Sequence, residues 1–351
     1  MSKPITSAQV TLNQLVPKSY VQVAIPVPMR KLFTYQVPDE LQQPPIHIGE
    51  RVAVSFGARR VVAVVVAMSS ECELDIKKIK PISKRLNDTF HLSDSLVSFL
   101  TLCANYYHHP IGDVFQQALP KLLRQVKKVE ITPPMVRHSQ IKLVKIESKA
   151  PKQFSLYQLI DKHQGISWAE LRTLGYSKAQ LNALKIKFLI SERKQQPSQF
   201  NWQENALTQE NKQILSTEQA IIVAAINQSL AQFSCHLIDG VTGSGKTEVY
   251  LQAMENVLAK NQQVLVIVPE IGLTPQTLLR FEQRFSVPIC LHHSNLNDTE
   301  RLDTWLNAQQ NSAAIIIGTR SAIFSPLHNL GMIIVDEEHD SSLKQQDSFR
   351  Y

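Results

Sequence analysis

The sequence has little of what marks secreted, membrane-spanning or zinc-binding proteins. Its 351 residues include only four cysteines, none in a C-x-x-C pair: Cys72, Cys103, Cys235 and Cys290. Isolated cysteines of this kind favour free thiols in a reducing cytoplasm over disulfides or zinc ligands. The first residues lack the apolar segment of a secretory signal, and every apolar run is far shorter than the roughly 20 residues of a bilayer span. We therefore expect a cytoplasmic protein with no membrane segment and no zinc ligands.

Two pairs of adjacent histidines, His108-His109 and His292-His293, could suggest a metal site. Side chains of adjacent residues diverge on any regular element, and no third ligand stands at a useful spacing. Packing or surface roles are the favoured interpretation.

Positive charge is concentrated in the first part of the chain. Residues 1–200 carry 28 Lys+Arg against 14 Asp+Glu, whereas residues 201–351 carry 9 against 16, within a net charge of +7. A basic segment beside an acidic one favours binding of a polyanion such as nucleic acid. A solvated basic surface without a partner is the alternative.

The first 120 residues predict a small β-rich unit followed by a helix. Short β-prone runs are found at Tyr20–Val27, Leu32–Val37, Arg51–Phe56 and Val61–Met68. The last two flank Gly57-Ala58-Arg59-Arg60 as the strands of a hairpin would. A helical apolar spacing follows over Asp94–Tyr107, and Pro110 must interrupt it.

Residues 125–200 predict a basic linker and a winged helix. Three amphipathic segments lie at Gln153–His163, Ser167–Leu174 and Ser177–Phe188, and a β-wing would follow Ile190. Ser167 and Ser177 are placed as helix N-caps. A DNA-reading role and plain three-helix packing both fit this pattern.

From Thr208 onward strands and helices alternate, which is typical of a parallel sheet with helices on both faces. Expected strands are Cys235–Asp239, Gln263–Val268, Ala313–Gly318 and Gly331–Asp336, and expected helices are Lys246–Leu258, Pro275–Phe285 and Asp298–Leu306. The fold class that we predict is a multidomain α/β protein.

A phosphate-binding loop stands between the first of these strands and the first helix. Its residues are Gly240, Val241, Thr242, Gly243, Ser244, Gly245, Lys246 and Thr247. The glycines let the backbone wrap the phosphates, Lys246 would hold the β- and γ-phosphates, and Thr247 would ligate Mg²⁺. A glycine-rich turn without a ligand is the alternative.

An acidic turn follows the last predicted strand. Asp336 is expected to hold Mg²⁺ through water, Glu337 to orient the attacking water, and Glu338 and His339 to complete the ATP site. An acidic cluster alone is usually a solvated turn, but its pairing with a phosphate loop favours an ATP and Mg²⁺ site. Arg320, which follows another strand, could pair with a DNA phosphate or belong to a structural loop.

These motifs together resemble a known family. The strings are GVTGSGKTEVY (240–250), VPEIGLTPQ (268–276), GTRSA (318–322), DEEHDSSLKQQ (336–346), YYHHPIGDV (106–114) and ALPKLLRQ (118–125). They resemble the primosomal protein N′ family, the PriA replication-restart helicases, along nearly all of the chain after its first 20 residues or so.

The resemblance implies a superfamily 2 helicase that unwinds DNA in the 3′→5′ direction, recognises stalled forks and initiates primosome assembly. It implies an N-terminal extension (1–19), a 3′ DNA-end-binding domain (20–118), a winged-helix domain (125–200) and a RecA-like helicase lobe (205–351). Expected partners are forked DNA with a leading-strand 3′ end, single-stranded-DNA-binding protein and other primosome proteins, in a cytoplasmic, nucleoid-associated setting.

The resemblance also implies residue roles. Gln219 would read adenine, and Phe33, Gly57 and Lys80 would form a pocket for the 3′-terminal nucleotide. Thr34 stands where the family has an acidic residue, so a hydroxyl would replace the carboxylate that accepts from the 3′-OH. Basic residues expected along the DNA path are Arg59, Arg60, Lys77, Lys78, Lys80, Lys84 and Arg85, and Lys344 and Phe349 are expected near DNA after the acidic turn.

Nothing in the sequence matches the family's second helicase lobe, its arginine-bearing motif or its cysteine-rich zinc segment, so zinc is expected only in that C-terminal part. We therefore expect this sequence to be a portion of a longer protein. We expect the portion by itself to bind DNA without unwinding it. Three hypotheses remain: a restart helicase or its N-terminal part, a non-catalytic fork-binding module with a remnant ATP site, and an unrelated phosphate-loop enzyme.

Overall fold

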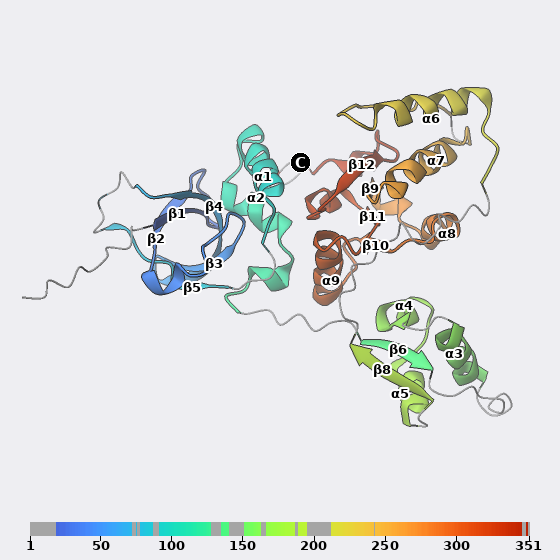
Figure 1. The fold of residues 1–351 in the computed structure, drawn as a ribbon, viewed down its shortest axis with the longest axis horizontal. Helices are drawn as coiled ribbons and strands as arrows, with labels where there is room; N and C mark the ends of the chain where they lie inside the picture. The colour runs from blue at the N-terminus through green and yellow to red at the C-terminus, as the bar shows by residue number, and fades with distance from the viewer. Residues whose placement is uncertain are drawn as a thin grey trace, which may run out of the picture. The chain divides into compact units, whose positions relative to one another are not determined.

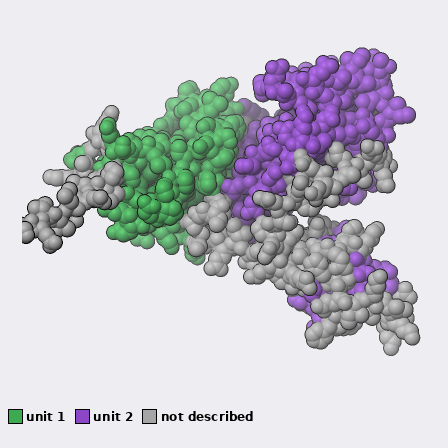
Figure 2. Space-filling view, in the orientation of Figure 1, with its two compact units in different colours: residues 1–119, 124–128, 345–351 green, residues 120–123, 129–344 purple. Residues whose placement is uncertain are grey.

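The computed structural model describes most of the chain as two compact units. Described residues are 19–71, 75, 78–86, 91–127, 135–139, 151–162, 166–186, 189–194, 212–241, 243–345 and 349. Unit 1 comprises residues 1–119, 124–128 and 345–351, and unit 2 comprises residues 120–123 and 129–344 (Figure 2). The expected N-terminal extension lies outside the described residues except Ser19, which begins the first strand.

Unit 1 is built on a curled antiparallel sheet. Its strands are β1 (Ser19–Ala24), β2 (Phe33–Val37), β3 (Arg51–Phe56), β4 (Arg59–Ser69) and β5 (Lys84–Arg85), in the order β2-β1-β4-β3-β5, with a short 3₁₀ turn at Asp39–Leu41. The segment before β5 hydrogen-bonds to both β2 and β3. Gln36 N of β2 donates to Lys80 O at 3.0 Å, and Ser83 N donates to Ala53 O of β3 at 2.8 Å. The strands consequently curve around one apolar core (Figure 1).

The β3–β4 connection is tighter than predicted. Arg59 and Arg60 belong to β4, which leaves Gly57 and Ala58 as a two-residue turn. Gly57 has φ 58°, a left-handed conformation that glycine adopts without a Cβ penalty. Val62, Ala63, Val64 and Val65 of β4 are all buried, so both faces of this strand are covered. Ala63 and Val65 belong to the main core, whereas Val62 packs with Ala53 and Leu86.

Two helices complete unit 1, α1 (Asp94–Tyr106) and α2 (Ile111–Ala118), and a 3₁₀ turn follows at Lys121–Arg124. Ser93 caps α1 by accepting from Leu96 N at 3.3 Å, and Pro110 separates the helices as predicted. A Cβ at Gly112 would lie 1.6 Å from Ile25 O, so glycine lets α2 approach the end of β1.

Unit 2 begins with three helices and a small antiparallel sheet, which is the order of elements predicted for a winged helix. The elements are β6 (Met135–Ser139), α3 (Pro151–Lys162), β7 (Ile166–Ser167), α4 (Trp168–Thr173), α5 (Lys178–Ile186) and β8 (Ile190–Lys194), with strand order β7-β6-β8. Their core includes Leu156, Ile160, Leu171 and Leu184.

The rest of unit 2 is a RecA-like parallel sheet, as predicted. Its elements are α6 (Thr217–Ser229), α7 (Lys246–Ala259), β9 (Gln263–Ile267), a turn at Glu270–Gly272, α8 (Pro275–Arg284), β10 (Ile289–His292), α9 (Asp298–Gln309), β11 (Ile315–Gly318), turns at Arg320–Phe324 and Ser341–Leu343, and β12 (Leu330–Val335). The strand order is β10-β11-β9-β12. Val264 and Val266 pack with α7 and α8, whereas Leu265 and Ile267 pack with Ala308 of α9, so helices cover both faces.

One predicted strand is wrong. Residues Cys235–Asp239 belong to no sheet, and Leu237 is 77% exposed. Apolar residues such as Leu237 and Ile238 are compatible with a strand, but strand pairing depends on contacts far along the chain. In the part of the chain that the structure describes, no helix is long and apolar enough to cross a membrane.

Candidate nucleotide and DNA-binding sites

The phosphate loop adopts a conformation that depends on its glycines. Gly243 and Gly245 have φ of 83° and 81°, and Gly245 is the N-cap of α7. A Cβ on Gly240 would lie 2.6 Å from Ser244 Oγ. Thr242 lies outside the described residues. The backbone therefore bends tightly just before the N-terminus of a helix, where N–H groups favour anions.

Lys246 points back into this loop. Its Nζ donates to Gly240 O at 2.6 Å and to Val241 O at 3.4 Å. These two contacts keep the ammonium group beside the loop backbone. A phosphate bound in the loop would therefore lie close to the positive charge of Lys246.

Gln219 ties α6 to the phosphate loop. Its Oε1 accepts from Ser216 N at 2.8 Å as part of a capping box, and its Nε2 donates to Ser244 O at 2.9 Å. A Cβ on Gly245 would lie 2.6 Å from the same Nε2. The structure thus places Gln219 beside the loop, and its role in reading adenine stays a prediction.

The acidic turn begins where β12 ends. Asp336 N donates to Ile267 O at 2.9 Å, which extends the pairing of β12 with β9. Glu337 N donates to Asp336 Oδ1 at 3.1 Å. Glu337 has φ 49°, and its carboxylate lies 3.6 Å from the imidazole of His339. Glu338 is exposed.

Tyr250 joins the two motifs, which sequence reasoning missed. Its hydroxyl donates to Asp336 Oδ2 at 3.4 Å and lies near the Thr247 side chain. Burial, together with the negative charge of Asp336, raises the pKa of the Tyr250 phenol above its usual value. The detectable signal was its position three residues after Thr247, on the same face of α7.

The donors brought together here fit a magnesium ion. Thr247 offers a hydroxyl and Asp336 a carboxylate, and Mg²⁺ prefers such oxygen ligands together with phosphate oxygens and water. Among the described residues, no group of three or more His, Cys, Asp and Glu side chains could hold a metal ion.

The paired histidines make other contacts. Burial, followed by the charges of Arg301 and His293, lowers the pKa of His292 to about 4. His108 Nδ1 lies 2.9 Å from an Arg30 nitrogen, and His109 Nε2 lies 3.8 Å from an Asp113 carboxylate oxygen.

The segment after the acidic turn differs from the expectation of DNA-facing side chains. Arg320 donates to Ser342 O at 3.1 Å and to Lys344 O at 3.0 Å, so it braces this segment. Phe349 belongs to unit 1, where it is 1% exposed and packs edge-on against Tyr107. Buried in this way, its ring is not open to a DNA base. The Lys344 side chain is exposed.

The predicted DNA-end residues gather around the start of β2. The Phe33 ring meets Phe56 edge-on at 5.1 Å, and Lys31 Nζ lies 5.3 Å from the Phe33 ring centroid. Phe56 directly precedes Gly57. Thr34 follows Phe33 in β2, and exposed Lys80 lies on the segment that pairs with Gln36 of the same strand. Arg59 and Arg60, next to the Gly57 turn, are also exposed.

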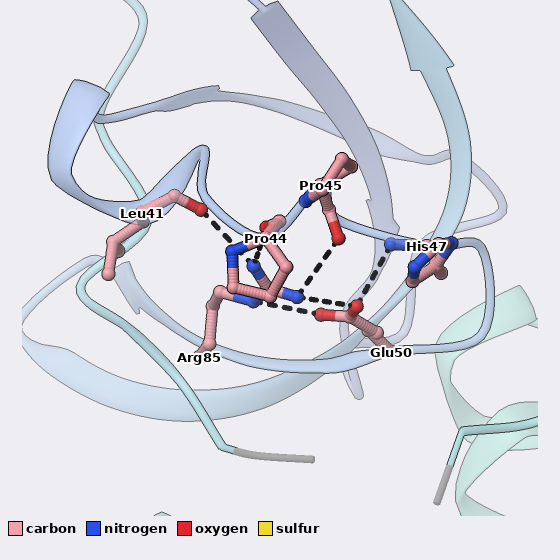
Figure 3. Close-up of polar contacts among 6 residues, drawn as sticks. All are labelled: Leu41, Pro44, Pro45, His47, Glu50 and Arg85. Atoms are coloured by element: carbon pink, nitrogen blue, oxygen red, sulfur yellow. Dashed lines mark hydrogen bonds and ion pairs between the residues drawn. The ribbon is translucent and has the colours of Figure 1, made fainter. Parts of the chain in front are cut away.

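Arg85 is a correction to the predicted DNA path. It forms an ion pair with Glu50 at 2.7 Å and donates to the carbonyl oxygens of Leu41, Pro44 and Pro45, while Glu50 also accepts from His47 N (Figure 3). Each guanidinium nitrogen is thus engaged inside the protein. Sequence cannot distinguish such a basic residue from one that faces DNA. Lys78 and Lys84 are exposed, and Lys77 lies outside the described residues.

Comparison with known proteins covers both units. Residues 22–120 match the PriA 3′DNA-binding domain (3′BD) family, and residues 216–351 match the DEAD/DEAH box helicase family. The Replication restart protein PriA of Haemophilus influenzae is 40% identical over 345 residues, which cover 94% of this chain and 46% of that protein. The protein of the same name from Bacillus subtilis is 31% identical over 408 residues, covering 95% and 50%.

A third relative, the Replication restart protein PriA of Chlamydia pneumoniae, is 32% identical over 342 residues, covering 94% of this chain and 45% of its own length. The chain therefore spans about half the length of these relatives. Since both family matches fall where the corresponding motifs were found, the chain belongs to the PriA replication-restart helicase family.

Proposed function

We propose that this chain supplies the DNA-end-binding and ATP-binding parts of a 3′→5′ DNA helicase that recognises abandoned forks and initiates primosome assembly. The observation that carries the proposal is the link between phosphate loop and acidic turn, in which Tyr250 of α7 contacts Asp336 and lies near Thr247. If the chain were an unrelated phosphate-loop enzyme, the match of residues 22–120 to a 3′ DNA-binding domain would have no explanation.

At the ATP site, Lys246 exchanges its contact with Gly240 O for the β- and γ-phosphates, while the backbone amides after Gly243 hold the remaining phosphate oxygens. Thr247, and Asp336 through water, would hold Mg²⁺, which would neutralise charge on the phosphates. Glu337, whose backbone is held at φ 49°, orients a water toward the γ-phosphate. Glu338 and His339 lie on the same turn.

At the DNA-end site, the Phe33 ring stacks on the terminal base, and Gly57 lets the backbone approach the sugar closely. The Thr34 hydroxyl accepts from the 3′-OH, and the ammonium of Lys80 pairs with a phosphate. Arg59 and Arg60 bind neighbouring phosphates at the same turn. The winged helix would contact the duplex arm of the fork.

The same proposal extends to setting and partners. The protein acts in the cytoplasm at the nucleoid, with single-stranded-DNA-binding protein and other primosome proteins as partners. Zinc binding, which the resemblance implies for the C-terminal part of the family, is proposed for no described residue of this chain.

ATP hydrolysis by the purified chain, with and without a forked DNA bearing a free leading-strand 3′ end, tests the proposal. DNA-stimulated hydrolysis that Lys246→Ala abolishes is the expected result for a motor whose site functions in this chain. Fork binding without nucleotide binding, unchanged by Lys246→Ala, would instead support a non-catalytic fork-binding module. Weak binding to every DNA tested would contradict both the helicase proposal and the non-catalytic fork-binding alternative.

A further inference from the structure

Tyr250 is a buried residue whose one polar atom has a specific environment. Its ring belongs to the core between α7 and α8, where it stacks on Phe281 with centroids 6.3 Å apart and planes at 21°. A phenylalanine would serve that packing equally well. The hydroxyl therefore needs an explanation of its own.

The two partners of this hydroxyl come from different motifs. Thr247 lies in the first turn of α7, and Asp336 follows β12, 86 residues beyond Tyr250. The phenol donates to Asp336 Oδ2, because a carboxylate can only accept, and it lies near the Thr247 side chain. The hydroxyl of Tyr250 thus connects α7, which carries Thr247, to the acidic turn.

The Asp336 carboxylate is held at both oxygens. Oδ2 accepts from Tyr250 at 3.4 Å, and Oδ1 accepts from Glu337 N at 3.1 Å. The amide contact is local to the acidic turn, whereas the phenol contact fixes the carboxylate relative to α7. Within the part of the chain that the structure describes, the phenol is the one side-chain donor to this carboxylate.

We propose that Tyr250 is a positioning residue for Mg²⁺ at the ATP site, where its hydroxyl holds the Asp336 carboxylate in place relative to Thr247 on α7. The inference rests on the proposed ATP site and goes beyond it by assigning a residue outside the phosphate loop and the acidic turn. Groups that hold metal ligands in place contribute substantially to metal affinity, since an unheld ligand must be ordered when the ion binds.

The test is a Mg²⁺ titration of labelled-ATP binding, followed by fluorescence, on the whole chain and on Tyr250→Phe. The substitution keeps the ring and removes only the hydroxyl. We expect the Mg²⁺ concentration at half-maximal binding to rise about threefold to tenfold, and the ATP affinity measured in excess EDTA to change by less than about twofold. The EDTA measurement also shows that the variant's phosphate loop is folded.

Tyr35→Phe is the matched control, because Tyr35 is another buried tyrosine whose hydroxyl donates to Ser55 O at 3.0 Å in unit 1. It should leave both quantities unchanged. An unchanged Mg²⁺ requirement in Tyr250→Phe, or an equal loss of affinity with and without Mg²⁺, would overturn the inference and leave the ATP site intact. Absence of any nucleotide binding by the unsubstituted chain would overturn the proposed function and the inference together.

Discussion

At the scale of single residues, the half-buried imidazole of His292 should make the stability of unit 2 depend on pH. Its ordinary pKa of 6.5 is lowered to about 4, so the folded protein binds this proton less tightly than the unfolded chain. The stability that the neutral ring contributes is complete above pH 6.5 and is lost as the pH falls toward 4. At pH 5 the free energy of unfolding should be lower by about 2 kcal/mol than it is above pH 6.5.

Urea unfolding of the chain and of His292→Gln at pH 7 and pH 5 measures this effect. Asp303 acts in the opposite direction, because burial and then Glu300 raise its pKa to about 6, so its contribution is lost as the pH rises. Both proteins contain Asp303, and the difference between them isolates His292. Equal pH dependence of the two would contradict the prediction.

The place of a residue in the site was predictable from the sequence where the residue belongs to a motif with a known chemistry. Lys246 and Asp336 lie at the phosphate loop and at the end of β12, as their spacing indicated. Tyr250 was not predicted as part of the site, since an aromatic at helical spacing is usually only core. Arg85 was misread because charge in a sequence does not show its partner.

At the scale of elements, the ion pair of Arg85 and Glu50 holds β5 against the chain that leads into β3. The Glu50 side chain is 5% exposed and that of Arg85 16% exposed. Glu50→Ala would leave a largely buried guanidinium without its counter-charge. We expect a loss of about 3–5 kcal/mol in the free energy of unfolding of unit 1.

Chemical denaturation followed by a probe in unit 1 measures that loss, with Glu40→Ala as the control. Glu40 is a surface glutamate in the neighbouring 3₁₀ turn Asp39–Leu41, and its removal should cost less than about 0.5 kcal/mol. Similar stabilities for the two variants would show that the pair is dispensable.

Helices and strands were predictable where apolar residues form a clear pattern in the sequence. Strand β3 has the predicted bounds, and α9 begins at Asp298 as predicted but ends at Gln309 rather than Leu306. Helix α6 was missed because its apolar residues surround the axis, with Ile221 exposed and Ile226 buried. Strand β10 was missed because it is short and only half-buried.

At the scale of the whole molecule, positive charge and the ATP motifs fall in different parts of the chain. The 28 Lys+Arg of residues 1–200 include every side chain proposed to bind DNA phosphates at the 3′ end, whereas residues 201–351 carry an excess of acidic groups. Affinity for a single strand with a free 3′ end should therefore fall steeply with salt, because binding releases counterions from the phosphates.

The logarithm of the association constant, measured by fluorescence anisotropy against the logarithm of NaCl concentration, should be linear. Arg60→Ala and Lys80→Ala should each reduce its slope by about 0.7, the value for one contact to a single-stranded phosphate. Lys260→Ala, which removes an exposed lysine just beyond α7, should leave the slope unchanged. If Lys260→Ala reduced the slope as much as the other two, the affinity would reflect net charge rather than a site on unit 1, and the assignment of Lys80 to a phosphate would be lost.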